Sequence, residues 1–284
     1  MKMQGYNGSQ APSRRPAAPP LARARAARAL TAGGARAGQA WDTSFAMQAV
    51  LEAGLGDAFP EFSTRVHRYL ERSQILSTPA SQASSAFPYE SVEMRLKYFR
   101  HVSKGGWPFS TSAHGWPIAD CTAEGLKAVL GLQHLACVRA AGQPLVTPPR
   151  LHDAVHVLLT YQNADGGWAT YENNRGYRFY EWLNPCETFG DIMIDYSYVE
   201  LSSASMTALA AFQRDHPAVR PRPARPRPVP RRRAEAPPRA RQHRREEIAA
   251  ALARGARFVR TIQRADGSWY PPPPPPPYCY PYTH

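Results

Sequence analysis

The chain has 284 residues, 43% of them hydrophobic, which is enough for one or two domains. Its formal net charge of +13 comes from two Arg/Pro-rich runs, with six arginines in 11–39 and nine in 218–242, so the remainder is close to neutral. No run of about 18 apolar residues occurs and the N-terminus lacks an apolar segment, so we expect neither a signal peptide nor a membrane-spanning helix.

The basic runs argue against a folded nucleic-acid-binding domain. Residues 11–39 and 218–242 contain no interleaved aromatic side chains and no recognisable binding motif. Nucleic-acid-binding tails therefore remain an alternative that rests on charge alone, and we expect no nucleic-acid partner. These runs, and the C-terminal segment with seven consecutive prolines, hold too few large apolar groups to fold, so we predict disorder there.

The four cysteines do not form a metal-binding or disulfide pattern. No CxxC spacing links Cys121, Cys137, Cys186 and Cys279. This usage fits a reduced intracellular protein, and we expect no metal and no cofactor.

Outside the biased runs the apolar residues recur at helical spacing. In the first such segment Trp41, Phe45 and Ala49 lie on one face, and Gly54 offers a C-cap. Alternation typical of strands is scarce, so the sequence predicts an all-α fold without a sheet. The predicted helices, in chain order, are 41–55, 62–73, 120–138, 151–162, 201–213 and 244–263.

Two of these helices end in a related phrase. Gln162 and Gln263 are each followed by Ala-Asp-Gly and, six residues later, by Trp168 and Trp269. The pattern indicates a repeated helix-ending unit, although two helices that merely end in similar turns would look the same. Tyr69-Leu70 with Gln74 suggests an interrupted third copy.

The most specific phrase is DCTAE, Asp120 to Glu124. With it occur GYNGSQ (5–10), WDTSFA (41–46), DGGWATYE (165–172) and ETFGDIMIDYSYVE (187–200). Together these phrases resemble the oxidosqualene cyclases of the terpene cyclase/mutase family, and the helix-ending phrases resemble the QW repeat of that family. Bacterial squalene cyclases have a second aspartate where this chain has Cys121.

The resemblance implies a catalytic set. Asp120 corresponds to the acid that protonates the epoxide of 2,3-oxidosqualene, Cys121 to a thiol that hydrogen-bonds the acid, and Glu124 to a glutamate linked to its reprotonation. Judged by residue type alone, Asp120 would be a helix N-cap and Glu124 a solvated helix residue. Leu201 stands where the family has a second cysteine, so one of the two thiol partners is missing.

The resemblance also implies which residues line the cavity that holds the cationic intermediates. Trp41, Phe109 and Tyr171 correspond to aromatic cavity positions, where π faces stabilise a cation without trapping it. As isolated aromatic residues they would instead be assigned to the core.

Three further positions bear on the product. Tyr6, His114 and Ile118 correspond to residues that the cycloartenol-forming members carry, whereas lanosterol-forming members differ at the last two. The triplet therefore favours cycloartenol.

The implied fold is an incomplete α/α barrel, and the implied enzyme is an isomerase of sterol biosynthesis located at the endoplasmic reticulum membrane surface or on lipid droplets. We expect the partial chain to be inactive alone; a non-catalytic helical interaction module and an incorrect gene model are the alternatives. Residues 11–39, 218–242 and 271–284 interrupt the family pattern, so we hypothesise translated non-coding sequence, which a spliced transcript encoding 11–39 in frame would refute. The predicted segments are 1–10 (family), 11–39 (insert), 40–217 (partial barrel), 218–242 (insert), 243–270 (barrel helix and repeat) and 271–284 (proline-rich tail).

Overall fold

The computed structural model describes residues 39–76, 97, 101–110, 116–185, 193–216 and 238–269, with the side chains of 238–243 left out. The described secondary structure is helical and contains only isolated β-bridges, so the all-α prediction is confirmed for this part. None of the described helices is both long and apolar enough to cross a bilayer. The helices are α2 (Gln39–Glu52), α3 (Pro60–Ser73), α5 (Ala119–His134), α6 (Ala136–Ala140), α7 (Pro148–Tyr161), the 3₁₀ helix η3 (Arg178–Leu183), α8 (Val199–Asp215) and α9 (Pro238–Thr261).

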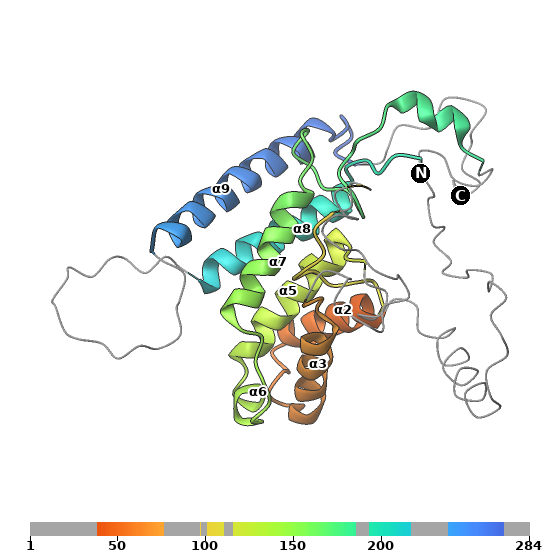
Figure 1. The fold of residues 1–284 in the computed structure, drawn as a ribbon. Helices are drawn as coiled ribbons and strands as arrows, with labels where there is room; N and C mark the ends of the chain where they lie inside the picture. The colour runs from red at the N-terminus through yellow and green to blue at the C-terminus, as the bar shows by residue number, and fades with distance from the viewer. Residues whose placement is uncertain are drawn as a thin grey trace.

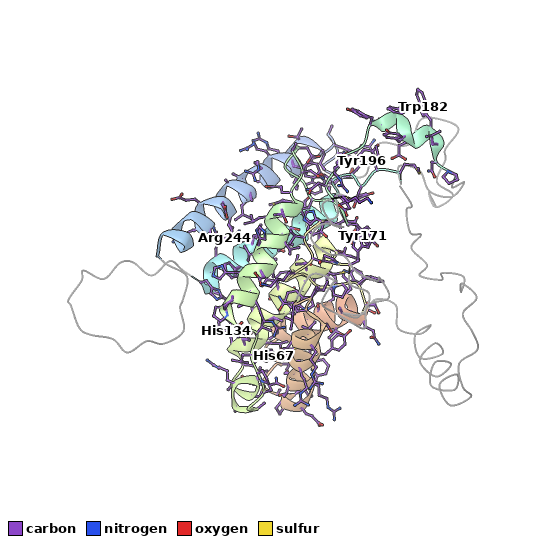
Figure 2. All side chains as sticks on the ribbon, in the orientation of Figure 1. His67, His134, Tyr171, Trp182, Tyr196 and Arg244 are labelled. Atoms are coloured by element: carbon purple, nitrogen blue, oxygen red, sulfur yellow. The ribbon has the colours of Figure 1, made fainter. Side chains whose placement is uncertain are left out.

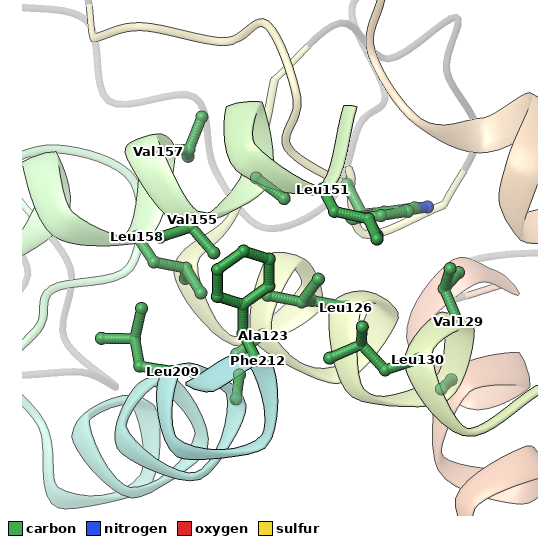
Figure 3. Packing of buried hydrophobic residues seen from close by; sticks show 14 of the residues in the cluster. Ala123, Leu126, Val129, Leu130, Leu151, Val155, Val157, Leu158, Leu209 and Phe212 are labelled. Atoms are coloured by element: carbon green, nitrogen blue, oxygen red, sulfur yellow. The ribbon is translucent and has the colours of Figure 1, made fainter. Parts of the chain in front are cut away.

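Helix α5 occupies the centre of the molecule. It packs against α2, α3, α7 and α8, while α9 lies outside α8 and α7 (Figure 1). Leu126 and Leu130 of α5 meet Leu158 of α7 and Phe212 of α8 in the core (Figure 3). Gly125 allows the ring of Trp107 to lie against α5, because an added Cβ would lie 2.8 Å from a ring carbon. Because most of α5 is buried against these neighbours, a carboxyl group in its first turn is partly withdrawn from water.

Five of the six predicted helices are present as single helices with shifted ends, and the sixth is divided in two. The C-cap prediction at Gly54 is confirmed, since this residue has a φ of 69° and its N–H donates to the Leu51 carbonyl. Helix α9 begins at Pro238, so the last five residues of the predicted insert 218–242 belong to a helix. The short helix η3 was not predicted.

The single helix predicted over 120–138 is wrong, because Leu135 is extended and separates α5 from α6. The Asp57 carboxylate stabilises this break, because it accepts hydrogen bonds from the backbone N–H of Ala136 at 3.4 Å and from that of Cys137 at 3.0 Å. A carboxylate at this position accepts hydrogen bonds from the first backbone N–H groups of α6 and so favours the start of a new helix.

Three turns that follow helices share one geometry. The indole N–H of Trp107, Trp168 and Trp269 donates to the carbonyl of Leu70, Leu158 and Val259, which in each case lies four residues before the glutamine. The glutamine amide donates to the carbonyl of a glycine with positive φ two residues before the tryptophan: Gln74 to Gly105, Gln162 to Gly166 and Gln263 to Gly267. The interrupted copy is therefore the same unit, with the chain between 75 and 104 inserted.

Two of the three glutamines also join neighbouring helices. Gln162 donates to the Ala251 carbonyl of α9 at 2.9 Å, and its side-chain oxygen accepts from Arg254. Gln74 is joined to α7 in the same way: its amide donates to the Arg150 carbonyl, and its side-chain oxygen accepts from the Arg150 guanidinium. Asp153 stands nine residues before Gln162, as Arg254 stands nine residues before Gln263, and it pairs with Lys104 at 3.1 Å.

Several predictions lie outside the described residues. These are the family segment 1–10, the inserts over 11–38 and 218–237, the tail 271–284, and the individual residues Tyr6, His114, Cys186 and Cys279.

Candidate functional site

One open pocket of about 310 Å³ lies between α2, α5 and α8. It contains two acidic residues from the DCTAE phrase and two aromatic residues from α2. Its lining consists of Trp41, Phe45, Asp120, Glu124, Lys127, Glu200, Ser203, Ala204 and Thr207.

Asp120 lies in the first turn of α5 and is partly buried. The N-cap is Ile118, which makes no side-chain cap, so the alternative that Asp120 is an N-cap is wrong. Burial raises the pKa of the Asp120 carboxyl above its usual value. Hydrogen bonds from the backbone and thiol of Cys121 act in the opposite direction, and the nearby Glu200 and Glu124 raise the pKa further. The net result favours a protonated carboxylic acid, the form that can donate a proton.

Cys121 follows the acid and is buried. Its backbone N–H donates to Asp120 Oδ1 at 2.7 Å. Burial raises the pKa of the Cys121 thiol, and the charge of Asp120 adds to that effect. The thiol therefore keeps its hydrogen and can serve as a donor beside Asp120.

Glu124 lies one helical turn after Asp120 and is only 2% exposed, so a solvated glutamate is excluded. Its Oε2 accepts from the Gln48 amide at 2.6 Å, and its Oε1 forms an ion pair with Lys127 Nζ at 2.8 Å. A buried carboxylate with a cationic partner and an amide donor is fixed in position and compensated in charge.

Aromatic rings border the pocket beside the acid. Trp41 and Phe45 are one turn apart on α2, with ring centroids 4.8 Å apart in an edge-to-face arrangement. The centroid of the Phe109 ring lies 6.1 Å from that of Trp41, and the Phe109 carbonyl accepts from the backbone N–H of Trp41 at 3.4 Å. None of the three is a fully buried core residue. Phe45 was missed as a site residue, although its i+4 relation to Trp41 could have revealed it.

Phe109, Ile118 and Tyr171 are not among the residues that line the pocket. Ile118 is buried immediately before α5. Tyr171 belongs to a loop whose Thr170 carbonyl accepts from the Ala119 N–H at 3.0 Å, and its ring stands edge-on to Trp116. Figure 2 shows Tyr171 at the side of the helical core, away from η3.

Comparison with known proteins gives relatives across most of the chain. The cycloartenol synthase of Dictyostelium discoideum is 39% identical over 272 residues, covering 95% of this chain and 28% of the relative. The lanosterol synthase of Homo sapiens is 44% identical over 239 residues, covering 83% of this chain and 27% of the relative. The chain belongs to the oxidosqualene cyclase family.

A more distant relative is consistent with that membership. The terpene cyclase/mutase atnI of Arthrinium sp is 33% identical over 235 residues, which cover 82% of this chain and 28% of the relative. No family model matches the chain. The chain spans about 28% of the length of the cycloartenol synthase it matches, so this oxidosqualene cyclase sequence corresponds to part of such an enzyme.

Leu201 stands at the position where the sequence analysis expects a second cysteine. Leu201 is a buried residue in the first turn of α8, so its side chain provides packing and no donor. The adjacent Glu200 lines the pocket and acts on Asp120 through its charge. Sequence reasoning missed Glu200 because only the packing of α8 against α5 brings it to the acid.

Proposed function

We propose that this site protonates the epoxide of 2,3-oxidosqualene and so begins its cyclisation to a sterol precursor. The observation that carries the proposal is a carboxyl group with a raised pKa and an adjoining thiol donor, placed at a pocket bordered by aromatic rings. Family membership supplies the substrate class, since the relatives are named for cycloartenol and lanosterol synthesis.

In the proposed reaction the Asp120 carboxyl donates its proton to the epoxide oxygen. The carbon–oxygen bond then opens, and the π electrons of a neighbouring double bond attack the carbon, which closes the first ring and moves the positive charge along the substrate. Trp41 and Phe45 present aromatic rings to the pocket that can stabilise such a charge. Cys121 is proposed to tune the acid through its thiol, and Glu124 to relay a proton to it: the Glu124 carboxylate takes up a proton from solvent and passes it on to the Asp120 carboxylate.

The proposal also covers the product of the reaction and the larger fold. Tyr6, His114 and Ile118 support cycloartenol as the product, with Phe109 and Tyr171 also bordering the substrate. The three helix-ending turns are proposed to be QW repeats, and 40–217 with 243–270 to be part of an α/α barrel. Because the barrel would be incomplete, the chain alone is proposed to be inactive, and the complete enzyme to work at an endoplasmic reticulum or lipid-droplet surface.

A non-catalytic helical module is the second candidate, and one observation favours it. Trp182 and Tyr177 of the η3 region are 86% and 71% exposed, which leaves an aromatic surface open to another protein.

A chimera separates the two candidates. Residues 40–216 would replace the matching stretch of the human lanosterol synthase, and the purified chimera would be incubated with 2,3-oxidosqualene. Formation of tetracyclic product supports the cyclase proposal, and a folded chimera that forms none contradicts it. If the chimera forms cycloartenol and its Ile118→Val variant forms a smaller fraction of it, the product proposal is supported. If the chimera and the variant both form only lanosterol, the product proposal is contradicted.

A further inference from the structure

Asp195 is a partly buried carboxylate that sequence reasoning did not single out. It accepts three consecutive backbone N–H groups: Thr170 at 2.9 Å, Tyr171 at 2.5 Å and Glu172 at 3.0 Å. Burial raises the pKa of the Asp195 carboxyl, while the three backbone N–H groups act in the opposite direction by stabilising the carboxylate, which offers only acceptors. These bonds fix the backbone of the loop that carries Tyr171.

The same loop is attached to the beginning of α5. The Thr170 carbonyl accepts from the Ala119 N–H at 3.0 Å, and Ala119 is the first residue of α5, directly before Asp120. A short path of two hydrogen bonds through Thr170 therefore joins the Asp195 carboxylate to the residue beside the acid.

The other end of the loop is attached to α8. The Trp168 carbonyl accepts from the Tyr198 backbone N–H at 3.0 Å, and the Trp168 backbone N–H donates to Ser202 Oγ at 2.9 Å. The segment from Trp168 to Glu172 thus connects the starts of α5 and α8, the two helices that bring Asp120 and Glu200 to the pocket.

We propose that Asp195 is a positioning residue: by holding residues 170–172 it fixes both Tyr171 and the first turn of α5, and so keeps Asp120 in its partly buried place. The proposal rests on the proposed function for the role of Asp120, but its geometry concerns the fold alone. Loss of the Asp195 charge should loosen the loop, free the Ala119 N–H and admit water to Asp120. Since burial is the main cause of the raised pKa of Asp120, greater hydration should lower it.

Asp195→Asn is the direct test in the full chain, because asparagine keeps the shape but turns an amide donor toward backbone N–H groups. Asp165→Asn is the matched control: Asp165 accepts the Gly167 N–H at 2.9 Å and the Ser197 hydroxyl in the neighbouring turn, without touching residues 170–172. The two readouts are hydrogen exchange at the backbone amides and the ¹³C titration of the Asp120 carboxyl, assigned by its loss in Asp120→Asn.

The expected result for Asp195→Asn is at least about tenfold faster exchange at 170–172 and at Ala119. The Asp120 midpoint should fall by about half a pH unit or more, and Asp165→Asn should change neither readout. Faster exchange at 170–172 with an unchanged Ala119 amide and an unchanged Asp120 midpoint would overturn the proposal.

Ala119→Pro provides a second variant in case Asp195→Asn does not fold. Proline is well tolerated at the first position of a helix, and the preceding Ile118 is extended, with φ −122° and ψ 142°. The variant removes the N–H that bonds the Thr170 carbonyl, so the Asp120 midpoint should fall as in Asp195→Asn; an unchanged midpoint overturns the proposal. Both readouts are independent of turnover, so an inactive chimera would refute the proposed function and leave this inference standing.

Discussion

At the scale of single residues, the protonation of Asp120 depends on a balance between burial and its immediate neighbours. Burial, Glu200 and Glu124 favour the neutral acid, while the hydrogen bonds from Cys121 favour the carboxylate. The oxidosqualene cyclase pattern expects a second thiol at the position of Leu201. Leucine offers no donor that could stabilise the carboxylate, so the pKa of Asp120 is expected to be higher than it would be with a cysteine at position 201.

Glu200→Gln should lower the pKa of Asp120, because a nearby negative charge that opposes ionisation is removed. The carboxyl is active as an acid below its pKa, so the pH range in which Asp120 stays protonated should shrink at its upper end. The ¹³C titration of Asp120 in the purified chain measures this change. Glu61→Gln is the control, since Glu61 is exposed, pairs with Arg65 and does not act on Asp120. A midpoint that rises or does not move in Glu200→Gln contradicts the assigned electrostatics.

At the scale of elements, the helix-ending turns do more than stop a helix. In two of them the glutamine also binds a carbonyl and an arginine of a neighbouring helix, so each turn couples two helices. The third, at Gln263, has the same internal hydrogen bonds, and no described helix follows it.

Gln162→Ala and Gln263→Ala separate these two roles. Gln162→Ala removes bonds to Gly166, Ala251 and Arg254 and should lower the free energy of unfolding by about 1–3 kcal/mol. Gln263→Ala removes the bond to Gly267 at an exposed site and should cost less than about 1 kcal/mol. Urea unfolding followed by circular dichroism gives both values. Equal losses would show that the link to α9 adds nothing.

Sequence periodicity predicted the existence of the six long helices, because each has an apolar face that the fold buries. It could not predict the break at Leu135, which depends on Asp57 from a distant turn. It also could not identify Arg150 as the partner of Gln74. The position on α7 that matches Arg254 of α9 is Asp153, which pairs with Lys104 instead. For the site, the DCTAE phrase was enough to locate Asp120 and its helix partner Glu124. Glu200 and Asp195 required tertiary packing, because nothing local in the sequence places them near α5.

At the scale of the whole molecule, the helices of this chain leave apolar surface uncovered. The η3 segment lies apart from the helical core, and Trp182 points outward from it (Figure 2). Phe179 and Leu183 of the same segment are 51% and 67% exposed. A surface of this kind marks a site that another part of a longer enzyme, or a partner, would cover.

The isolated chain is therefore expected to self-associate, and Trp182→Gln should reduce this. Removing the most exposed indole lowers the apolar area available for association without disturbing the core. Concentration-dependent light scattering and sedimentation measure the effect, with Trp269→Gln as the control at a tryptophan that holds a helix end. A monodisperse, monomeric wild-type chain would contradict the expectation.

The central claim is that Asp120 is the acid that opens the epoxide, and product formation by the chimera with human lanosterol synthase tests it most directly. Asp120→Asn keeps the size of the side chain but cannot donate an acidic proton, whereas Asp42→Asn alters an exposed aspartate in the first turn of α2. Asp120→Asn should lower conversion of 2,3-oxidosqualene by about 10²–10⁴-fold or more, and Asp42→Asn should leave it nearly unchanged. Conversion by Asp120→Asn within a few-fold of the parent chimera would contradict it.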